Sequence, residues 1–549
     1  MNEELNKALE QISDDHLNEA VAYQRKGFPW VRSIAAVLAV VIAWTAIWAA
    51  FDFKPPVIVP EATDPILQGP TFGPSVAPFD PTEPNTPTTP SSPIKPSDPA
   101  EPNIPTSPSN PIKPSTPRPE YPTNLGNIQS PGTLHLSNLV AGPKYPQMVQ
   151  HPVYSPNLDY NEYYAALTQW RNSKRKQHNQ PEGYADSLTD FWAKSIPEFL
   201  SGDGNRAYSP ANLYLALAML AEVTGGQTRQ QVLDLLGADS IAALRTQAGH
   251  VWNALYCDDG ETTSLLANSL WLDDAYNFKD ATVQNLVNHY YASVFNGDLG
   301  TEEMNRQLRA WLNSQTGGLL QEQTENTKLD PASVFALAST IYFAAGWDSK
   351  FNETRTADGI FHGKDQDLTV PFMNKTITDD FYYWGEDYGA IRLSLTSGSM
   401  WLILPDEGKT VEDVLASGEY LEMIQSPAYW KNKSAPKINL SMPKFDISSQ
   451  ANLVEGMKNL GLTHVFDRKT ADFTPMTNTQ QLFLGKVDHA VRVSIDEEGV
   501  LAAAYTVMDF PTEGIPIPPE SEINFDLDRP FLFLVNSGVP LFAGVVEQP

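Results

Sequence analysis

The chain has 549 residues, a formal net charge of −29 at pH 7 and a single cysteine, Cys257. Nucleic acid, heparin-like polyanions and anionic lipid would repel so acidic a protein, which excludes them as favoured partners. A lone cysteine excludes an internal disulfide, and we expect its thiol to be buried in the core.

A membrane anchor is predicted near the N-terminus. A polar, helix-prone segment of residues 1–32 precedes an apolar run from Ser33 to Phe51, and we place a transmembrane helix at residues 33–53. About 19 apolar residues suffice to cross a hydrocarbon core of about 30 Å. Three basic residues flank the N-terminal side of the run: Arg25, Lys26 and Arg32. The positive-inside rule therefore predicts a cytoplasmic N-terminus and an extracellular remainder.

A cleaved signal peptide is the alternative reading of this run. Its charged region would be unusually long here, and the sequence AIWAAFDF is a poor cleavage site. We therefore expect the anchor to be retained in the cell membrane, as a single pass.

Residues 54–135 are predicted to form a stalk. From Pro81 to Pro117 every third residue is proline, and the sequence PIKPS occurs at Pro93 and again at Pro111. A polyproline II helix has three residues per turn, so these prolines share one edge of a stiff spacer that could extend about 115 Å. A stalk through a cell wall fits better than a ligand for proline-binding modules, because an extracellular location disfavours the latter.

The segment of residues 136–182 is rich in aromatic and polar residues. It resembles no family segment, and the sequence leaves open whether it wraps around the following domain or forms an extra helix. Its basic run, Lys174-Arg175-Lys176, is predicted to be a solvated face rather than a nucleic-acid site. Residues 183–549 are long enough for one large domain.

A helix is predicted to begin after Ser209. This residue is a good N-cap, Pro210 suits the first turn, and Gly225 suits a C-terminal stop. Four residues form an apolar stripe along the predicted helix: Leu213, Ala216, Leu217 and Leu220.

An uncharged stretch from Val500 to Met508 precedes a proline-rich loop. Taken alone it could be a buried strand or a short helix. Alternate residues of a strand face the same side. One face would carry Val500, Ala502, Ala504, Thr506 and Met508, and the other Leu501, Ala503, Tyr505, Val507 and Asp509. Because the first face has no charge, it could pack against a core.

The surroundings of this stretch resemble the serpin family. Ile495-Asp496-Glu497-Glu498-Gly499 is similar to the hinge of the serpin reactive loop, and NFDLDRPFLFLV at 524–535 is similar to the signature that follows the loop. Other matches are residues 205–210 with the helix after them, a helix at 305–318 with Trp311, Asn313 and Thr316, a central strand at 337–351 with Trp347, and His489 of the serpin shutter. Together the matches run in order from about residue 183 to residue 546.

The resemblance implies an α+β serpin fold, with three β-sheets, about eight or nine helices and an exposed reactive loop. The anchor and the stalk would make it a membrane-anchored, bacterial-type member. The activity implied is suicide-substrate inhibition of a serine protease, with a cysteine protease as a minor variant. The acyl-enzyme is trapped when the cut loop inserts into the central sheet. We expect a monomer without cofactor or metal. No enzyme activity is expected, because the chain lacks GxSxG, P-loop and HExxH motifs.

The resemblance also assigns site residues. The hinge comprises Glu497, Glu498, Gly499, Val500, Leu501, Ala502, Ala503 and Ala504. The shutter and breach comprise Ser209, Asn212, Ser339, Trp347 and His489. Ser339 stands where the family usually has Asn, and Asn212 where it often has Ser, so the two could compensate in one hydrogen-bond network with Ser209 and His489.

The family's count of fifteen residues from the hinge glycine places the reactive bond at Glu513–Gly514. Counting backward from the segment after the bond gives Ile515–Pro516 instead. We prefer the first bond, because insertion length fixes where the protease ends and a bond before proline is a poor substrate. Glu513 suggests a protease that accepts an acidic residue, whereas Thr512 would suit an elastase-like or subtilisin-like enzyme.

Two departures from the family pattern favour an alternative. Val500 replaces the usual Thr or Ser, and Tyr505 stands where a small residue is common. Both features are compatible with a non-inhibitory serpin that acts as a surface binding module or carrier. A purely structural surface protein would explain the anchor and the stalk, but not the uncharged loop.

Overall fold

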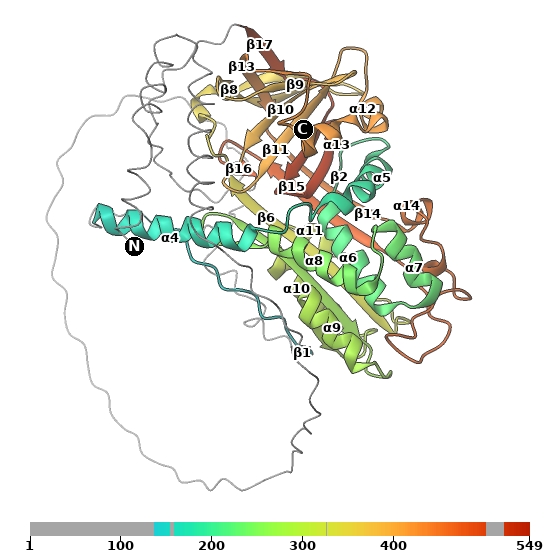
Figure 1. Ribbon diagram of the computed structural model, residues 1–549. Helices are drawn as coiled ribbons and strands as arrows, with labels where there is room; N and C mark the ends of the chain where they lie inside the picture. Colours follow the sequence, from blue (N-terminus) through green and yellow to red (C-terminus); the bar gives the residue numbers. More distant parts are fainter. Residues whose placement is uncertain (1–136, 154–158, 326, 501–520) are drawn as a thin grey trace, which may run out of the picture. The chain divides into compact units, whose positions relative to one another are not determined.

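Three β-sheets form the scaffold of the residues that the computed structural model describes, which are 137–153, 159–325, 327–500 and 521–549. All of them lie in one compact unit, residues 113–549 (Figure 1). The predicted anchor and stalk lie outside the described residues. Among the described residues, no helix combines the length and the apolar character needed to cross a membrane.

Sheet A is the largest sheet. Its strands are β1 (Leu139–Ala141), β3 (Cys257–Asp258), β4 (Thr263–Leu272), β5 (Ala292–Asn296), β6 (Phe335–Gly346), β14 (Phe445–Asn452), β15 (Asp488–Ile495) and β16 (Gly499–Val500). They lie in the order β1-β5-β4-β6-β16-β15-β14, and β3 pairs with β4. Cys257 of β3 is completely buried, as the sequence predicts.

Sheet B forms the second layer. It contains β2 (Arg206–Tyr208), β9 (Tyr382–Trp384), β10 (Tyr388–Ser394), β11 (Ser399–Pro405), β12 (Lys433–Ser434), β18 (Phe531–Asn536) and β19 (Pro540–Val546). Sheet C contains β7 (Ala357–His362), β8 (Asp367–Ile377), β13 (Lys437–Pro443) and β17 (Glu522–Asp526). The predicted signature segment thus supplies β17 and β18. Strand β18 and its neighbour β11, two of the inner strands of sheet B, are almost wholly buried.

The helices gather mainly beside sheets A and B (Figure 1). They are α4 (Tyr160–His178), α5 (Thr189–Leu200), α6 (Pro210–Val223), α7 (Gly226–Leu235), α8 (Ile241–Leu255), α9 (Asp280–Tyr290), α10 (Glu302–Gln315), α11 (Gln321–Thr324), α12 (Val411–Ser417), α13 (Glu419–Gln425) and α14 (Val454–Asn459). Ten of these, α5 to α14, follow residue 183 in the described part of the chain. The expectation of about eight or nine was therefore slightly low.

Helix α6 begins as predicted, because the Ser209 hydroxyl accepts a hydrogen bond from the Asn212 N–H and Pro210 occupies the first turn. The predicted apolar stripe is confirmed at Leu213, Leu217 and Leu220, which are buried, but it underestimates the burial of the helix. The helix is buried around almost its whole circumference, and Ala216 is its one half-buried position. A helix that is apolar all round belongs inside a large protein.

Gly225 follows the end of α6, but its backbone is extended, at φ −134°, and not left-handed. A Cβ atom there would lie 2.7 Å from the Asp472 carboxylate oxygen Oδ2. Close packing against Asp472, rather than a left-handed stop, is therefore what requires glycine at this position.

Candidate functional site

The hinge begins with a tight turn between β15 and β16. Asp496 Oδ1 accepts hydrogen bonds from the N–H groups of Glu498, at 2.9 Å, and Gly499, at 3.3 Å. Asp496 N–H also donates to the Gly499 carbonyl. The short side chain of Asp496 thus reverses the chain and directs Gly499 back into sheet A.

Both following glutamates are held by cations. Glu497 is 5% exposed, and its carboxylate accepts hydrogen bonds from Lys444 Nζ at 2.5 Å and Thr356 Oγ1 at 2.7 Å. Burial by itself raises the pKa of Glu497, but the hydrogen bonds from Lys444 and Thr356 outweigh it and lower the pKa. Glu498 pairs with Lys350 Nζ at 2.5 Å. These carboxylates are therefore anchors of the turn, which agrees with a structural rather than a catalytic role.

Strand β16 is already part of sheet A. Gly499 pairs with Gly346 and Val500 with Ala345 of β6, while Val500 also pairs with Ile495 of β15. A Cβ atom at Gly499 would lie 2.3 Å from the Ala345 carbonyl oxygen, so only glycine fits so close to β6. The Val500 side chain is 2% exposed and belongs to the main hydrophobic core.

Below β16, sheet A is open between its two central strands. In the described residues, β6 and β15 are joined only through the two residues of β16, and no direct ladder connects them. The first five residues of β6, Phe335 to Ser339, are only half-buried, although the strand lies in the middle of the sheet. In the part of the chain that the structure describes, these two parallel strands therefore share no ladder below β16.

Trp347 closes the upper end of this opening. Its ring N–H donates to the Asp496 carbonyl at 2.8 Å, and its backbone N–H donates to the Glu498 carbonyl at 2.9 Å. The indole is 3% exposed and packs against Phe351. Trp347 therefore fixes the hinge turn to the end of β6.

The five predicted shutter and breach residues do not all lie together: Trp347 is at the hinge turn, and the other four converge at the middle of sheet A. Ser209 N–H donates to His489 Nε2 at 3.0 Å, and Ser209 Oγ accepts from Asn212 N–H at 3.1 Å. Asn212 Oδ1 lies beside Ser339 Oγ, which is also 2.8 Å from Oδ1 of Asn268 on β4. One hydrogen-bond network thus connects α6, β4, β6 and β15.

Proton counting fixes one feature of this network. The Ser339 hydroxyl has one proton and cannot donate to two carbonyl oxygens. Asn268 is oriented by its own NH₂ group, which donates to the Tyr290 carbonyl at 2.7 Å. The Ser339 proton therefore serves one of the two amide oxygens at a time. Asn212 is oriented in the same way as Asn268, because its NH₂ group donates to the Ser339 carbonyl at 3.4 Å. The exchanged residues, Asn212 and Ser339, are thus directly hydrogen-bonded.

His489 is neutral in this environment. Burial lowers its pKa to about 4, and its ring lies 6.3 Å from the ring of Tyr208 on β2. The accepted hydrogen bond from Ser209 requires Nε2 without a proton, which is consistent with a neutral ring. This geometry suits a structural histidine, and it gives no support to a general base.

Several predicted site residues lie outside the described part of the chain. These are the distal hinge residues Leu501, Ala502, Ala503 and Ala504, and the reactive-bond candidates Thr512, Glu513, Gly514 and Ile515. Their roles stay predictions. The described chain resumes at Ser521, whose carbonyl accepts from Lys437 N–H before β17 begins.

Both alternatives that the sequence left open for residues 136–182 occur. Strand β1 pairs with β5 at the edge of sheet A, and α4 is an extra helix that packs on α8. The expectation of a solvated basic face is wrong for Lys174, whose ammonium group is paired with buried Asp259, and holds for Arg175 and Lys176, which are exposed. The spacing of Leu167, Trp170 and Lys174 on one side of a helix was the available signal.

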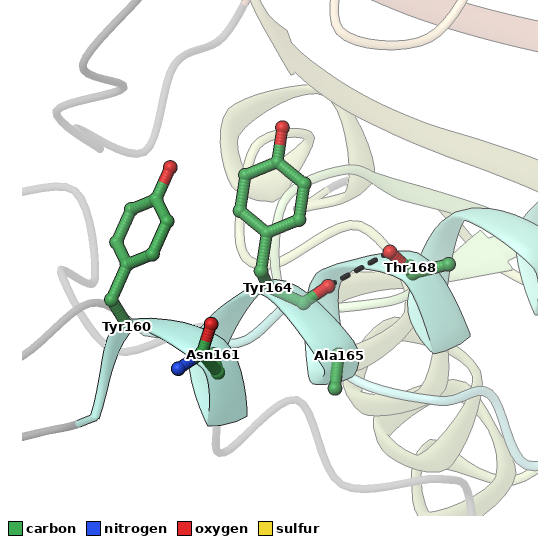
Figure 2. Close-up of a pocket in the computed structure, with 5 residues that line it drawn as sticks. All are labelled: Tyr160, Asn161, Tyr164, Ala165 and Thr168. Atoms are coloured by element: carbon green, nitrogen blue, oxygen red, sulfur yellow. Dashed lines mark hydrogen bonds between the residues drawn. The ribbon is translucent and has the colours of Figure 1, made fainter.

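The exposed side of α4 carries a shallow hollow lined by Tyr160, Asn161, Tyr164, Ala165 and Thr168. Figure 2 shows both tyrosine rings standing away from the helix, with Thr168 Oγ1 bonded to the Tyr164 carbonyl at 2.8 Å. Among the described residues every lining side chain comes from this one helix. The hollow has a single wall, which is too little to define a ligand site.

Comparisons with known proteins agree with this architecture. The profile of the family described as serpin (serine protease inhibitor) matches residues 187–549. Serpin-ZX of Arabidopsis thaliana is 27% identical and covers 65% of this chain and 95% of its own length. Alpha-1-antiproteinase of Callosciurus caniceps is 29% identical and covers 70% of this chain and 94% of its own length.

Solved structures show the same fold. The native state of Tengpin, a thermophilic serpin, is 25% identical, covers 68% of this chain and 95% of its own, and gives a TM-score of 0.59. The native stressed conformation of AtSerpin1 from Arabidopsis is 24% identical, covers 67% and 98% respectively, and gives a TM-score of 0.58. The family profile begins at residue 187, so it leaves the anchor and the bacterial-type subgroup as predictions. Because that profile spans well over half of the sequence, the chain belongs to the serpin family.

Proposed function

We propose that this serpin is a suicide-substrate inhibitor of a serine protease, with a cysteine protease as a minor variant. The observation that carries the proposal is the opening in sheet A. Gly499 and Val500 already lie between β6 and β15, at the upper end of the opening. The predicted reactive loop follows directly after Val500 in the sequence. A cut loop could continue this strand downward and pair with β6 on one side and β15 on the other.

The register of β16 predicts the partners of each inserted residue. Gly499 pairs with Gly346 and Val500 with Ala345, so each step forward in the loop is one step back in β6. In the same way Val500 pairs with Ile495, which fixes the register on β15. Ala504 would therefore stand between Ile341 and Val491, both of which are buried.

This register supports the assignment of the loop faces. Directly paired residues face the same side of a sheet, so the face that begins with Val500 would pack toward the main core. The other face would begin beside Ala344 and Tyr342, which belong to a separate small apolar cluster with Leu319. Thr506 would stand between Ser339 and His489 and could join the hydrogen-bond network of the shutter.

The alternative is a non-inhibitory serpin that acts as a surface binding module. Val500 was one of its two supports, but sheet A accommodates the Val500 side chain in its core, which weakens that support. Tyr505 still favours the alternative. Thyroxine-binding globulin complexed with thyroxine has a similar fold, at 20% identity and a TM-score of 0.56, and this likeness concerns the fold alone.

The proposal is tested by incubating the full-length protein, in detergent, with a panel of serine proteases. We expect a complex that survives SDS, because an acyl-enzyme is a covalent bond. Cleavage is expected at Glu513–Gly514, and mass spectrometry of the released C-terminal fragment locates the cut. A fragment that begins at Pro516 would show that the backward count is right. Cleavage by every protease without any stable complex would favour the non-inhibitory alternative.

We also propose that the serpin domain lies outside the cell, anchored by residues 33–53. The flank of Arg25, Lys26 and Arg32 and the proline-rich stalk support this topology. Protease added to intact cells is then expected to release the domain. Full protection in intact cells, with cleavage only after lysis, would contradict the proposed orientation.

A further inference from the structure

The extension that precedes the family domain is fixed to it at several points of its described residues. Strand β1 pairs with β5, and the Tyr145 ring stacks on the rings of Trp252, Tyr256 and Tyr291 at centroid distances of 5.9, 5.6 and 5.9 Å. On α4, Leu167 and Trp170 are buried. The extension is therefore a packed part of the structure, and its contacts can act on the domain.

Lys174 makes the most consequential of these contacts. Its Nζ lies 3.1 Å from Asp259 Oδ2, 3.4 Å from Glu261 Oε2 and 3.4 Å from the Thr396 carbonyl oxygen. The Asp259 side chain is 0% exposed, and Trp170 Nε1 also donates to it. Burial by itself raises the pKa of Asp259, but Lys174 and the hydrogen bonds lower it, so the pair is ionised.

Thr396 connects this ion pair to the hinge. It lies in the turn between β10 and β11 of sheet B, and its N–H donates to the Gly346 carbonyl at 2.9 Å. Its hydroxyl is 3.1 Å from the hydroxyl of Thr262, which belongs to the turn before β4. Gly346 in turn pairs with Gly499. Direct contacts thus run from α4 to the residue at which loop insertion begins.

The same contacts join two parts that must move relative to each other when the opening in sheet A widens to admit the whole loop. Strand β6 is paired with β4 over ten residue pairs, so β6 can move further from β15 only if β4 moves with it. Lys174 holds the turn that leads into β4, through Asp259 and Glu261, and also holds the β10–β11 turn of sheet B. Lys174 therefore connects the part of sheet A formed by β4 and β6 to the β10–β11 turn of sheet B.

We propose that Lys174 is a positioning residue that holds the top of β6 in place and slows loop insertion until a protease has cut the loop. This inference rests on the proposed inhibitory function, because it needs a loop that can insert. Its role differs from simple support of the fold. Loss of the contact should increase the rate at which the uncut loop inserts spontaneously, rather than only lower the stability of the intact protein.

The test compares three full-length variants in detergent: Lys174→Met, Lys174→Arg and Lys176→Met. Each is held uncut at a raised temperature below its melting point, and two quantities are followed. These are the loss of inhibitory activity and the gain of a monomeric, heat-resistant, inserted form. Lys174→Met is expected to convert about tenfold faster than wild type, which corresponds to about 1.4 kcal/mol in the barrier.

The other two variants are the matched controls. Lys176 is exposed on the same helix, so Lys176→Met should convert at the wild-type rate. Lys174→Arg should stay close to wild type, because a guanidinium can still donate to Asp259. Conversion of Lys174→Met at the wild-type rate, or its loss of activity through unfolding without the inserted form, would overturn the inference.

Because Lys174→Met leaves Asp259 buried without its cation, that variant could fail to fold. Thr396→Val supplies an independent test, since it removes the hydroxyl contact with Thr262 and introduces no buried charge. This variant too should accelerate spontaneous insertion. Insertion at the wild-type rate would count against a restraint by these contacts.

If the wild-type protein traps no protease and gains no heat resistance when cut, the proposed function itself fails. If the wild-type protein traps the protease and gains heat resistance when cut, but Lys174→Met and Thr396→Val insert their loops no faster than wild type, only the role of Lys174 fails.

Discussion

Ala504→Arg is expected to convert the inhibitor into a substrate. In the register set by β16, Ala504 would enter sheet A between Ile341 and Val491, which are 8% and 3% exposed. An arginine there would have to bury its charge without a partner, at a cost of several kcal/mol. If about 3 kcal/mol of this cost falls on the insertion barrier, insertion slows roughly 100-fold. Hydrolysis of the acyl-enzyme is then faster than loop insertion, and active protease is released.

The measurement is the number of inhibitor molecules consumed per protease inactivated, together with the yield of SDS-resistant complex. The variant should fold and should be cut at the same bond as wild type. Equal inhibition by Ala504→Arg and by wild type would show that inhibition does not depend on insertion. The non-inserting, binding-module reading would then replace the present proposal.

The choice of control depends on the structure. The sequence suggests Ala503→Arg, on the other strand face, as a milder change that reaches solvent. In the register of β16, however, Ala503 would stand beside Tyr342, which is buried under Leu319. A better control is Val507→Arg, because Val507 would stand beside Asp488, an exposed carboxylate at the start of β15. That arginine could stay hydrated and pair with Asp488, so Val507→Arg should retain most of the inhibition.

Local chemistry explains which features of the fold were predictable. The start of α6 follows from an N-cap and a proline that are adjacent in sequence, and the structure confirms both. The packing around α6 depends on elements far along the chain, which is why its apolar stripe underestimates its burial. The same limit applies to Lys174. The basic residues that follow it, Arg175 and Lys176, are exposed, whereas its counter-ion, Asp259, is 85 residues away, and only the folded chain brings the two together.

The candidate site shows a similar division. The hinge motif could be recognised from its residues, and the structure adds that the Glu497 and Glu498 carboxylates anchor the turn. Exchange of Asn212 and Ser339 was visible as a departure from the family pattern. That both converge with Asn268 is a fact of three-dimensional pairing, because Asn268 lies opposite Ser339 on β4. No local pattern indicates such a partner.

Cleavage of the loop is expected to raise the melting temperature by on the order of 10 °C or more. In the register of β16, the cut loop could pair with β6 as far as Phe335, the first residue of that strand, and with β15 as far as Asp488. Each added backbone hydrogen bond contributes about 1 kcal/mol net, and about 1 kcal/mol shifts the melting temperature of a large domain by roughly 2 °C. New bonds on both edges roughly offset the entropy of ordering the loop, and burial of the face that begins with Val500 against the main core supplies the net stabilisation.

Scanning calorimetry of intact and cut protein at one scan rate measures this difference, because unfolding of a large protein is often irreversible. The cut form of Ala504→Arg is the matched control, since its charge opposes insertion at the same point of the sheet. It should show a much smaller rise than cut wild type. Equal melting temperatures for intact and cut wild type would mean that the opening between β6 and β15 is not filled by the loop. Thr506 would then never reach Ser339 and His489, and sheet A would have to be regarded as stable with its two central strands apart.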